Sequence, residues 1–285
     1  MRMVEANGVR IATQAFGSPD DPAVVLIMGA TASMLGWPEA FCHTLAGHGF
    51  HVIRFDHRDT GQSTTCPPGH SVYAVEDLAD DVIGILDAYG LERAHLIGMS
   101  LGGYIGQMLA LNFRERVRTL TLIASEPLGW DGPALPHISD EFLAHFAGLT
   151  ELDWSNEAAV TQFLLTSERM SVSPSGQFDA VVVRDRIAEV LARTESPASI
   201  FNHAGLSVRD DWTGRFREIS VPVLVLHGED DPILPVENGR AIAAGIRGAE
   251  FVGYPGVGHE LPASHLDVMT GAIADHLSRS GSSDR

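Results

Sequence analysis

Lysine is missing from this chain of 285 residues, whose 19 basic side chains are all arginines. The absence excludes chemistry that depends on a lysine amine, such as Schiff-base catalysis, a Ser-Lys dyad or the phosphate-binding P-loop. Basic side chains are also few compared with the 37 acidic ones, which gives a formal net charge of −18. Because this charge repels nucleic acid and anionic membranes, we expect neither among the partners of the protein.

Cysteine and long apolar segments are scarce as well. The two cysteines, Cys42 and Cys66, lack a CxxC or metal-type spacing, so we expect two free thiols. The longest apolar run, residues 23–28, is far too short to span a bilayer, and residues 1–17 lack the apolar core of a signal peptide. We therefore expect a soluble, cytoplasmic protein that holds no metal.

Short apolar runs that end at turn residues alternate with helical patterns along much of the chain. Such runs are typical of parallel strands that helices cover on both faces. The alternation predicts an α/β fold with an open, mostly parallel, doubly wound sheet. The expected strands are residues 23–28, 51–55, 94–97, 119–124, 221–226 and 251–254.

The clearest helical pattern covers residues 75–89, where apolar side chains recur on one stripe. Acidic residues crowd its first turns, where the helix dipole favours negative charge. We expect these side chains to form a solvated face and not a metal site. They are Glu76, Asp77, Asp80 and Asp81.

The alternation of strands and helices stops at residues 128–217. This segment has helical patterns at residues 140–149, 155–166 and 178–191 and no strong strand signal. A helical segment inserted late in a parallel sheet is typical of a lid over the carboxyl ends of the strands, where ligands bind. The expected organisation is therefore a core of residues 1–127 and 218–285, with residues 128–217 as a helical lid.

Residues 98–102 read Gly-Met-Ser-Leu-Gly, a G-x-S-x-G sequence between the expected strand 94–97 and a helical run. In such a strand-to-helix turn the serine backbone is strained, and small neighbours leave room for it. Ser100 is therefore the candidate nucleophile. A serine hydroxyl needs an adjacent base, which in turn needs a carboxylate to fix its tautomer.

A carboxylate and a histidine follow in the order that this arrangement requires. Glu229, Asp230 and Asp231 lie just after the strand 221–226, and the spacing alone leaves the choice among them open. Glu126 is an alternative acid at the end of an earlier strand. His259 lies in a glycine-rich loop after the strand 251–254, which makes it the candidate base.

These motifs resemble the α/β-hydrolase fold family over nearly the whole chain. Within it, the segments 28–30, 36–38, 56–64 and 98–102 resemble the bacterial branch that contains aclacinomycin methylesterase. The resemblance implies a triad of Ser100, Asp231 and His259. It also implies an oxyanion hole formed by the backbone N–H groups of Leu101 and Ala30.

One position departs from the pattern of many relatives. They carry histidine where this chain has Met28, so a side chain that often braces the oxyanion loop is missing. Nearby, we expect Asp56, Arg58 and Asp59 to brace their own loop through one salt-bridge network. His57 lies in the same loop and can approach the site, whereas we expect His203, in the lid, to have a packing role or to contact the substrate.

The predicted function is hydrolysis of a carboxylic ester through an acyl-enzyme on Ser100, without a metal or an organic cofactor. The resemblance suggests a small-molecule substrate, a methyl ester or lactone of a bulky polyketide-like acyl group. The same triad also serves carbon–carbon bond hydrolases, cofactor-free perhydrolases and cyclising acyltransferases. A ligand-binding receptor with little turnover is the alternative of another class.

Several large apolar residues are candidates for lining a substrate pocket beneath the lid. For each of them, packing in the core is the competing interpretation. These candidates are Trp37, Trp130, Phe163, Met170 and Phe201.

Overall fold

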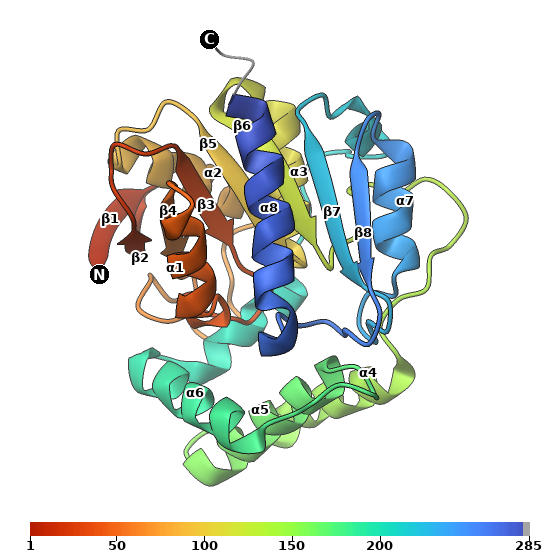
Figure 1. Ribbon diagram of the computed structural model, residues 1–285. Coiled ribbons are helices and arrows are strands. Elements are labelled where there is room, and N and C mark those ends of the chain that lie inside the picture. Colours follow the sequence, from red (N-terminus) through yellow and green to blue (C-terminus); the bar gives the residue numbers. More distant parts are fainter. Residues whose placement is uncertain (282–285) are drawn as a thin grey trace.

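The computed structural model describes residues 1–281 and contains, within them, one sheet of eight strands (Figure 1). The strand order is β1-β2-β4-β3-β5-β6-β7-β8, and every neighbouring pair from β4 to β8 is parallel. The expected α/β fold with a mostly parallel sheet is confirmed. The strands are β1 (Arg2–Ala6), β2 (Val9–Phe16), β3 (Ala23–Ile27), β4 (His51–Phe55), β5 (Ala94–Met99), β6 (Val117–Ile123), β7 (Val223–Gly228) and β8 (Glu250–Tyr254).

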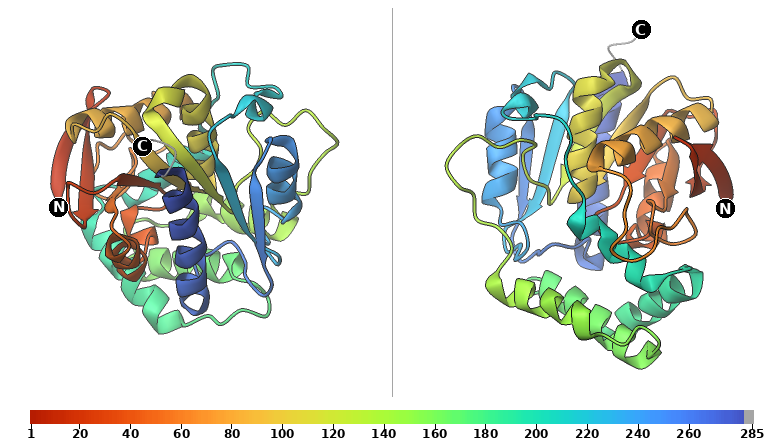
Figure 2. Two further views of the ribbon diagram at one scale, coloured as in Figure 1. Left: turned by 45° about the horizontal axis from the view of Figure 1, so that its top comes forward. Right: turned by 180° about the vertical axis from the view of Figure 1, so that it is seen from behind.

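Helices cover both faces of the sheet and bury two hydrophobic clusters against it. α1 (Glu39–Gly47) and α8 (Leu266–Gly281) pack in front of the sheet as Figure 1 shows it. α2 (Val75–Ala88), α3 (Leu101–Asn112) and α7 (Glu237–Gly245) cover the other face, which Figure 2 shows from behind. Burial on both faces explains why the central strands are almost wholly apolar.

The N-terminal strands β1 and β2 were not predicted. They form an antiparallel hairpin, and β2 pairs antiparallel with β4. Alternate residues of β1 are exposed, so its sequence lacks a continuous apolar run. The turn residues Asn7 and Gly8 both have positive φ, 45° and 77°. An Asn-Gly pair between alternating residues is a strong hairpin signal and could have revealed both strands.

The segment between β6 and β7 is helical, as expected. Its α-helices lie at the end of the molecule where β7 and β8 end (Figure 1). We call residues 128–217 the insertion; its exact limits and its function as a lid stay predictions. The insertion holds α4 (Asp140–Ala147), η3 (Gly148–Glu151), α5 (Glu157–Ser171), α6 (Ala180–Arg193), η4 (Pro197–Gly205) and η5 (Arg215–Glu218).

The expectation of a solvated acidic face on α2 is wrong for two of its four residues. Glu76 and Asp81 are only 8% and 1% exposed. Glu76 Oε1 accepts hydrogen bonds from the backbone of Arg209 and from the indole of Trp212, at 2.9 and 3.0 Å. Asp81 accepts two from the guanidinium of Arg58. Partners far along the chain thus make their burial tolerable.

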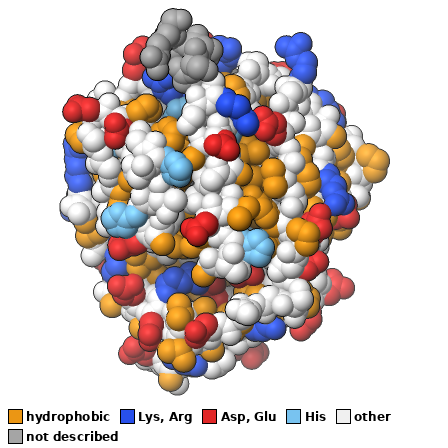
Figure 3. Space-filling model, viewed as in Figure 1, with side chains coloured by type: hydrophobic (Ala, Val, Ile, Leu, Met, Phe, Trp, Pro, Cys, Tyr) orange, Lys and Arg blue, Asp and Glu red, His pale blue; other side chains and the backbone are white. Residues whose placement is uncertain are grey.

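Elsewhere on the surface, acidic side chains are spread over the face seen in Figure 3, in keeping with the net charge of −18. Among residues 1–281, no helix is both long and apolar enough to cross a bilayer. Cys42 and Cys66 are free thiols, as expected, and burial raises the pKa of Cys42 to about 12.

Candidate active site

Ser100 occupies a strained turn between β5 and α3. Its backbone angles are φ 53° and ψ −120°, a conformation that non-glycine residues rarely adopt. Its amide donates to the carbonyl of Ile123 at 2.9 Å, which fixes the turn to β6. A Cβ at Gly98 would collide with the carbonyl of Gly102, and one at Gly102 would collide with that of Ile27. The glycines of the motif are thus required by close backbone packing.

The loop after β3, residues 28–31, lies directly against Ser100. A Cβ added to Gly29 would lie 3.3 Å from Ser100 Cβ and 3.8 Å from Ser100 Oγ. Leu101 is the first residue of α3, where backbone N–H groups have no partner inside the helix. The backbone amides of Ala30 and Leu101 therefore both belong to segments that adjoin the Ser100 side chain.

Asp231 and His259 are joined by a hydrogen bond. Asp231 Oδ2 lies 2.8 Å from His259 Nδ1, and Asp231 Oδ1 accepts from the amides of Ile233 and Leu234 at 2.8 and 2.9 Å. These contacts occupy both carboxylate oxygens and orient the imidazole. Because β5, β7 and β8 are parallel, the loops after them place Ser100, Asp231 and His259 at one end of the sheet.

The charge of the Asp231 carboxylate is favoured by its histidine neighbours. Burial by itself raises the pKa of Asp231, but the adjacent His259 and the contacts of His227 outweigh it and hold the pKa well below its ordinary value. His227 Nε2 lies 3.4 Å from Asp231 Oδ2 and 2.7 Å from the carbonyl of Leu234. His227 was not predicted; its place four residues before the acid, at the end of β7, was the available signal.

The other acid candidates make different contacts. Glu229 faces Arg240 at 3.7 Å, Glu126 faces His137 at 3.3 Å, and Asp230 accepts a hydrogen bond from Ser173 at 3.0 Å. Of these carboxylates, only Asp231 bonds to His259. The described residues contain no hydrogen bond between Ser100 Oγ and His259. Such contacts are often long in a free enzyme and tighten in the complex with substrate.

The insertion touches the loops that carry Asp231 and His259. The amide of His259 donates to the carbonyl of Ser171 at the end of α5, at 2.8 Å. A Cβ at Gly258 would collide with the backbone of Ser173. Ser173 Oγ in turn donates to Asp230. The end of α5 and the turn after it are therefore packed against both loops.

Replacement of Asp230 by asparagine should lower kcat/KM by less than about tenfold. Asp230 is exposed, and an amide oxygen can still accept from the Ser173 hydroxyl, a contact whose loss costs about 1 kcal/mol. Steady-state kinetics with a chromogenic ester would measure this. A loss as large as that expected for Asp231→Asn would contradict the choice of the acid.

The loop 56–64 is braced, but not by the single network that we expected. Arg58 pairs with Asp81 and Asp59 accepts from the Tyr73 hydroxyl at 2.6 Å, whereas the buried Asp56 pairs with Arg193 of α6 at 2.9 Å. The three charges thus bond to separate partners outside the loop. The Asp56–Arg193 pair ties the insertion to the end of β4.

Replacement of Arg193 by leucine should lower the free energy of unfolding by on the order of 3 kcal/mol, because it leaves the buried Asp56 carboxylate without a cation. Burial raises the pKa of Asp56. The deficit should therefore be smallest below about pH 4, where Asp56 is protonated, and grow as the pH rises through that raised pKa. Urea unfolding at several pH values would measure it.

The matched control is Arg186→Leu. Arg186 pairs with Glu168 at 2.8 Å, and both side chains are more than a third exposed, 34% and 39%. Such pairs contribute about 0–1 kcal/mol. Equal losses of stability in the two variants would show that the Asp56–Arg193 pair is not specially important.

Two of the predicted pocket residues are placed elsewhere, so these predictions are wrong. Trp37 is fully buried beneath α1, with its ring 5.2 Å from that of Phe41, and offers a substrate no surface. Trp130 packs against Phe216 on the α3 and α7 side, and its indole donates to the carbonyl of Pro133. Both rings thus pack against core residues, Trp37 fully buried and Trp130 partly exposed.

The other three candidates lie on the helices α5 and η4 of the insertion. Phe163 of α5 and Phe201 of η4 share an aromatic cluster with Phe146, with ring centroids about 6 Å apart. Met170 lies on α5 and is partly exposed. Their positions leave a contact with substrate as a prediction.

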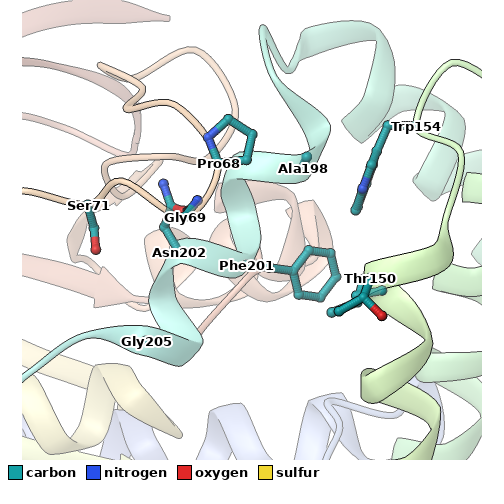
Figure 4. A pocket seen from close by; sticks show the side chains of 10 residues that line it. Pro68, Gly69, Ser71, Thr150, Trp154, Ala198, Phe201, Asn202 and Gly205 are labelled. Atoms are coloured by element: carbon teal, nitrogen blue, oxygen red, sulfur yellow. Dashed lines mark hydrogen bonds between the residues drawn. The ribbon is translucent and has the colours of Figure 1, made fainter.

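A cavity of about 410 Å³ opens between the insertion and the loop at residues 68–71 (Figure 4). Phe201 and Trp154 form its aromatic wall, and Pro68 lies across from them. Ser100, Asp231 and His259 are not among the residues that line it. The cavity is therefore distinct from the end of the sheet that holds Ser100, Asp231 and His259.

Comparison with known proteins agrees with this architecture. The family model described as alpha/beta hydrolase fold matches residues 22–266. Rhodomycin D methylesterases of Streptomyces peucetius and of Streptomyces sp. strain C5 are each 31% identical, over 96% of this chain and 97% of the relative. An esterase structure from Exiguobacterium antarcticum is 20% identical, with a TM-score of 0.79 over 97% of this chain and 98% of that one. The chain therefore belongs to the α/β-hydrolase fold family.

Proposed function

We propose that this chain hydrolyses a carboxylic ester through an acyl-enzyme on Ser100. Its family and its two methylesterase relatives identify it as a hydrolase that acts on esters. The observation that carries the proposed mechanism is the Asp231–His259 hydrogen bond of 2.8 Å at the sheet end where the strained Ser100 turn lies. This pair is the base and its orienting carboxylate.

In the proposed reaction, Ser100 Oγ attacks the ester carbonyl while His259 Nε2 takes its proton. Asp231 keeps the imidazole in the required tautomer and stabilises the imidazolium. The amides of Leu101 and Ala30 bind the oxyanion, and one such donor contributes about 3–4 kcal/mol in the transition state. His259 then protonates the leaving alcohol, and water releases the acid from Ser100. Neither a metal nor an organic cofactor takes part.

The proposed substrate is a small molecule, a methyl ester or lactone with a bulky polyketide-like acyl group. Its support is the likeness to the two rhodomycin D methylesterases. In this proposal residues 128–217 form a lid over the core of residues 1–127 and 218–285. Phe163, Met170 and Phe201 are the remaining candidates for acyl contacts, because they lie on the helices α5 and η4 of that lid.

The test is a pre-steady-state burst with p-nitrophenyl acetate, combined with labelling by a serine-directed phosphonate. We expect a burst and a label on Ser100 that each approach one equivalent per chain. A tight ligand without burst or label would favour a binding protein instead. Product analysis with water, peroxide and alcohol as acceptors would then separate hydrolysis from perhydrolysis and acyl transfer.

A further inference from the structure

A histidine of the insertion bonds to the loop that adjoins Ser100. The amide of Thr31 donates to His203 Nδ1 at 3.0 Å, although the two residues are 172 positions apart in the sequence. His203 belongs to η4 and is 6% exposed. The sequence motifs around Ser100 contain nothing that points to this contact.

The two main-chain partners of His203 determine its protonation state. A backbone N–H can only donate, so the Nδ1 atom that accepts from Thr31 carries no proton. Nε2 lies 2.8 Å from the carbonyl oxygen of Arg58, which can only accept, so Nε2 carries the proton. The ring is therefore a neutral imidazole in one tautomer, with both nitrogens bonded to backbone.

A second histidine holds the same loop from the core side. His57 Nε2 lies 3.0 Å from the carbonyl of Met28, to which it donates, and its ring is perpendicular to that of His203 at 5.8 Å. The loop is thus fixed at its first residue by His57 and at its last residue by His203. Thr31 has φ 65°, a conformation that persists only where neighbours enforce it.

We propose that His203 is a positioning residue that holds the 28–31 loop so that the amide of Ala30 points at the oxyanion on Ser100. The inference rests on the proposed function. The Thr31 amide lies in the peptide plane that follows Ala30, so its hydrogen bond restricts how the preceding amide can turn. The insertion therefore supplies a brace for a loop that carries Met28 where many relatives have histidine.

The charged groups around His203 are already engaged. The Arg58 side chain pairs with Asp81, and the Asp59 carboxylate accepts from Tyr73 and from Asn202 Nδ2 at 2.9 Å. Burial lowers the pKa of His203, against the opposing effects of Arg58 carbonyl and Asp59. Burial likewise lowers the pKa of His57, to about 3. Both rings therefore remain neutral near pH 7, and in His203 the Nδ1 atom can accept from the Thr31 amide only in this neutral form.

The test compares two replacements of His203 that each retain one of its contacts. In His203→Asn the amide oxygen can take the place of Nδ1 and accept from Thr31. In His203→Gln the longer amide reaches Arg58 but leaves Thr31 without its acceptor. We expect kcat per phosphonate-titrated site to fall by about 10- to 100-fold in His203→Gln and by less than about threefold in His203→Asn, with KM little changed in both.

A trifluoromethyl ketone, which forms an oxyanion on the serine, supplies the second measurement. Its inhibition constant should rise in His203→Gln by the same factor by which kcat/KM falls. His95→Asn is the control for loss of a buried histidine, because His95 bonds to Thr119 at the other end of β5. It should lower the melting temperature and leave kcat per titrated site and the inhibition constant unchanged.

Three outcomes would overturn the inference. Unchanged kcat and ketone inhibition in His203→Gln would show that the contact does not position the loop. Equal losses in His203→Asn and His203→Gln would show that the Thr31 acceptor is not what matters. A wild-type protein without burst or label would remove the proposed function itself, a failure distinguishable from the other two, in which the wild type is active.

Discussion

Replacement of Ser100 by alanine should lower kcat for a p-nitrophenyl ester on the order of a million-fold and abolish the burst. In the proposed mechanism Ser100 Oγ forms the acyl bond, so no other part of the site can compensate for its loss. Ester binding should change little, because the backbone amides of Ala30 and Leu101 remain in place. Stopped-flow kinetics measures the fall in kcat and the loss of the burst, and phosphonate labelling tests whether the reactive hydroxyl is gone.

A serine outside the site serves as the matched control. Ser220 is exposed and accepts a hydrogen bond from Arg114, so Ser220→Ala should keep its full burst. Full activity of Ser100→Ala, or a label on another residue, would exclude Ser100 as nucleophile. A circular dichroism melt of both variants shows whether the fold is retained.

Replacement of Asp231 by asparagine should lower kcat on the order of ten-thousand-fold. The backbone amides of Ile233 and Leu234 bond to Oδ1, so an asparagine oxygen there would direct its NH2 group at His259 Nδ1. The imidazole would then carry its proton on Nε2, the nitrogen that must accept the proton of Ser100. Rapid-quench or steady-state kinetics would measure the loss.

The comparison with Asp230→Asn makes this prediction specific. The two aspartates are neighbours in sequence, but Asp230 is exposed, whereas Asp231 is buried, with 4% of its surface exposed, and bonds to the imidazole of His259. A loss below about tenfold in Asp231→Asn would place the acid elsewhere. Glu229 and Glu126 would then be the next residues to replace.

Much of the fold follows from local sequence pattern. Near-continuous apolar runs mark β3 to β7, because helices bury both of their faces. The Ser100 turn is also recognisable from pattern, since its motif occupies five consecutive residues and Gly98 packs against the backbone of Gly102. Gly102 in addition packs against Ile27 of β3, a contact that the motif does not reveal. The hairpin of β1 and β2 was not predicted, because the edge strand β1 has exposed residues between its buried ones and therefore no such run.

Side-chain direction and long-range partners could not be read from pattern. Trp37 and Phe201 are both large and apolar, but only the folded chain shows that the first is fully buried and the second lines a cavity. The helical pattern predicts surface positions for Asp81 and Glu76, because it contains no sign of their partners, Arg58 and Trp212, which lie elsewhere in the sequence. The contact between His203 and Thr31 could not be predicted either, because only tertiary packing brings these two residues together.

The main-chain bonds from the insertion to the loops of His259 and Thr31 bear on protein engineering. If residues 128–217 act as the proposed lid, a chimera that grafts the helical segment of another hydrolase onto this core would change more than the contacts with the substrate. It would also remove the carbonyl that receives the His259 amide and the imidazole that receives the Thr31 amide. Such a graft should therefore carry its own partners for both loops, or specificity will be exchanged at the expense of rate.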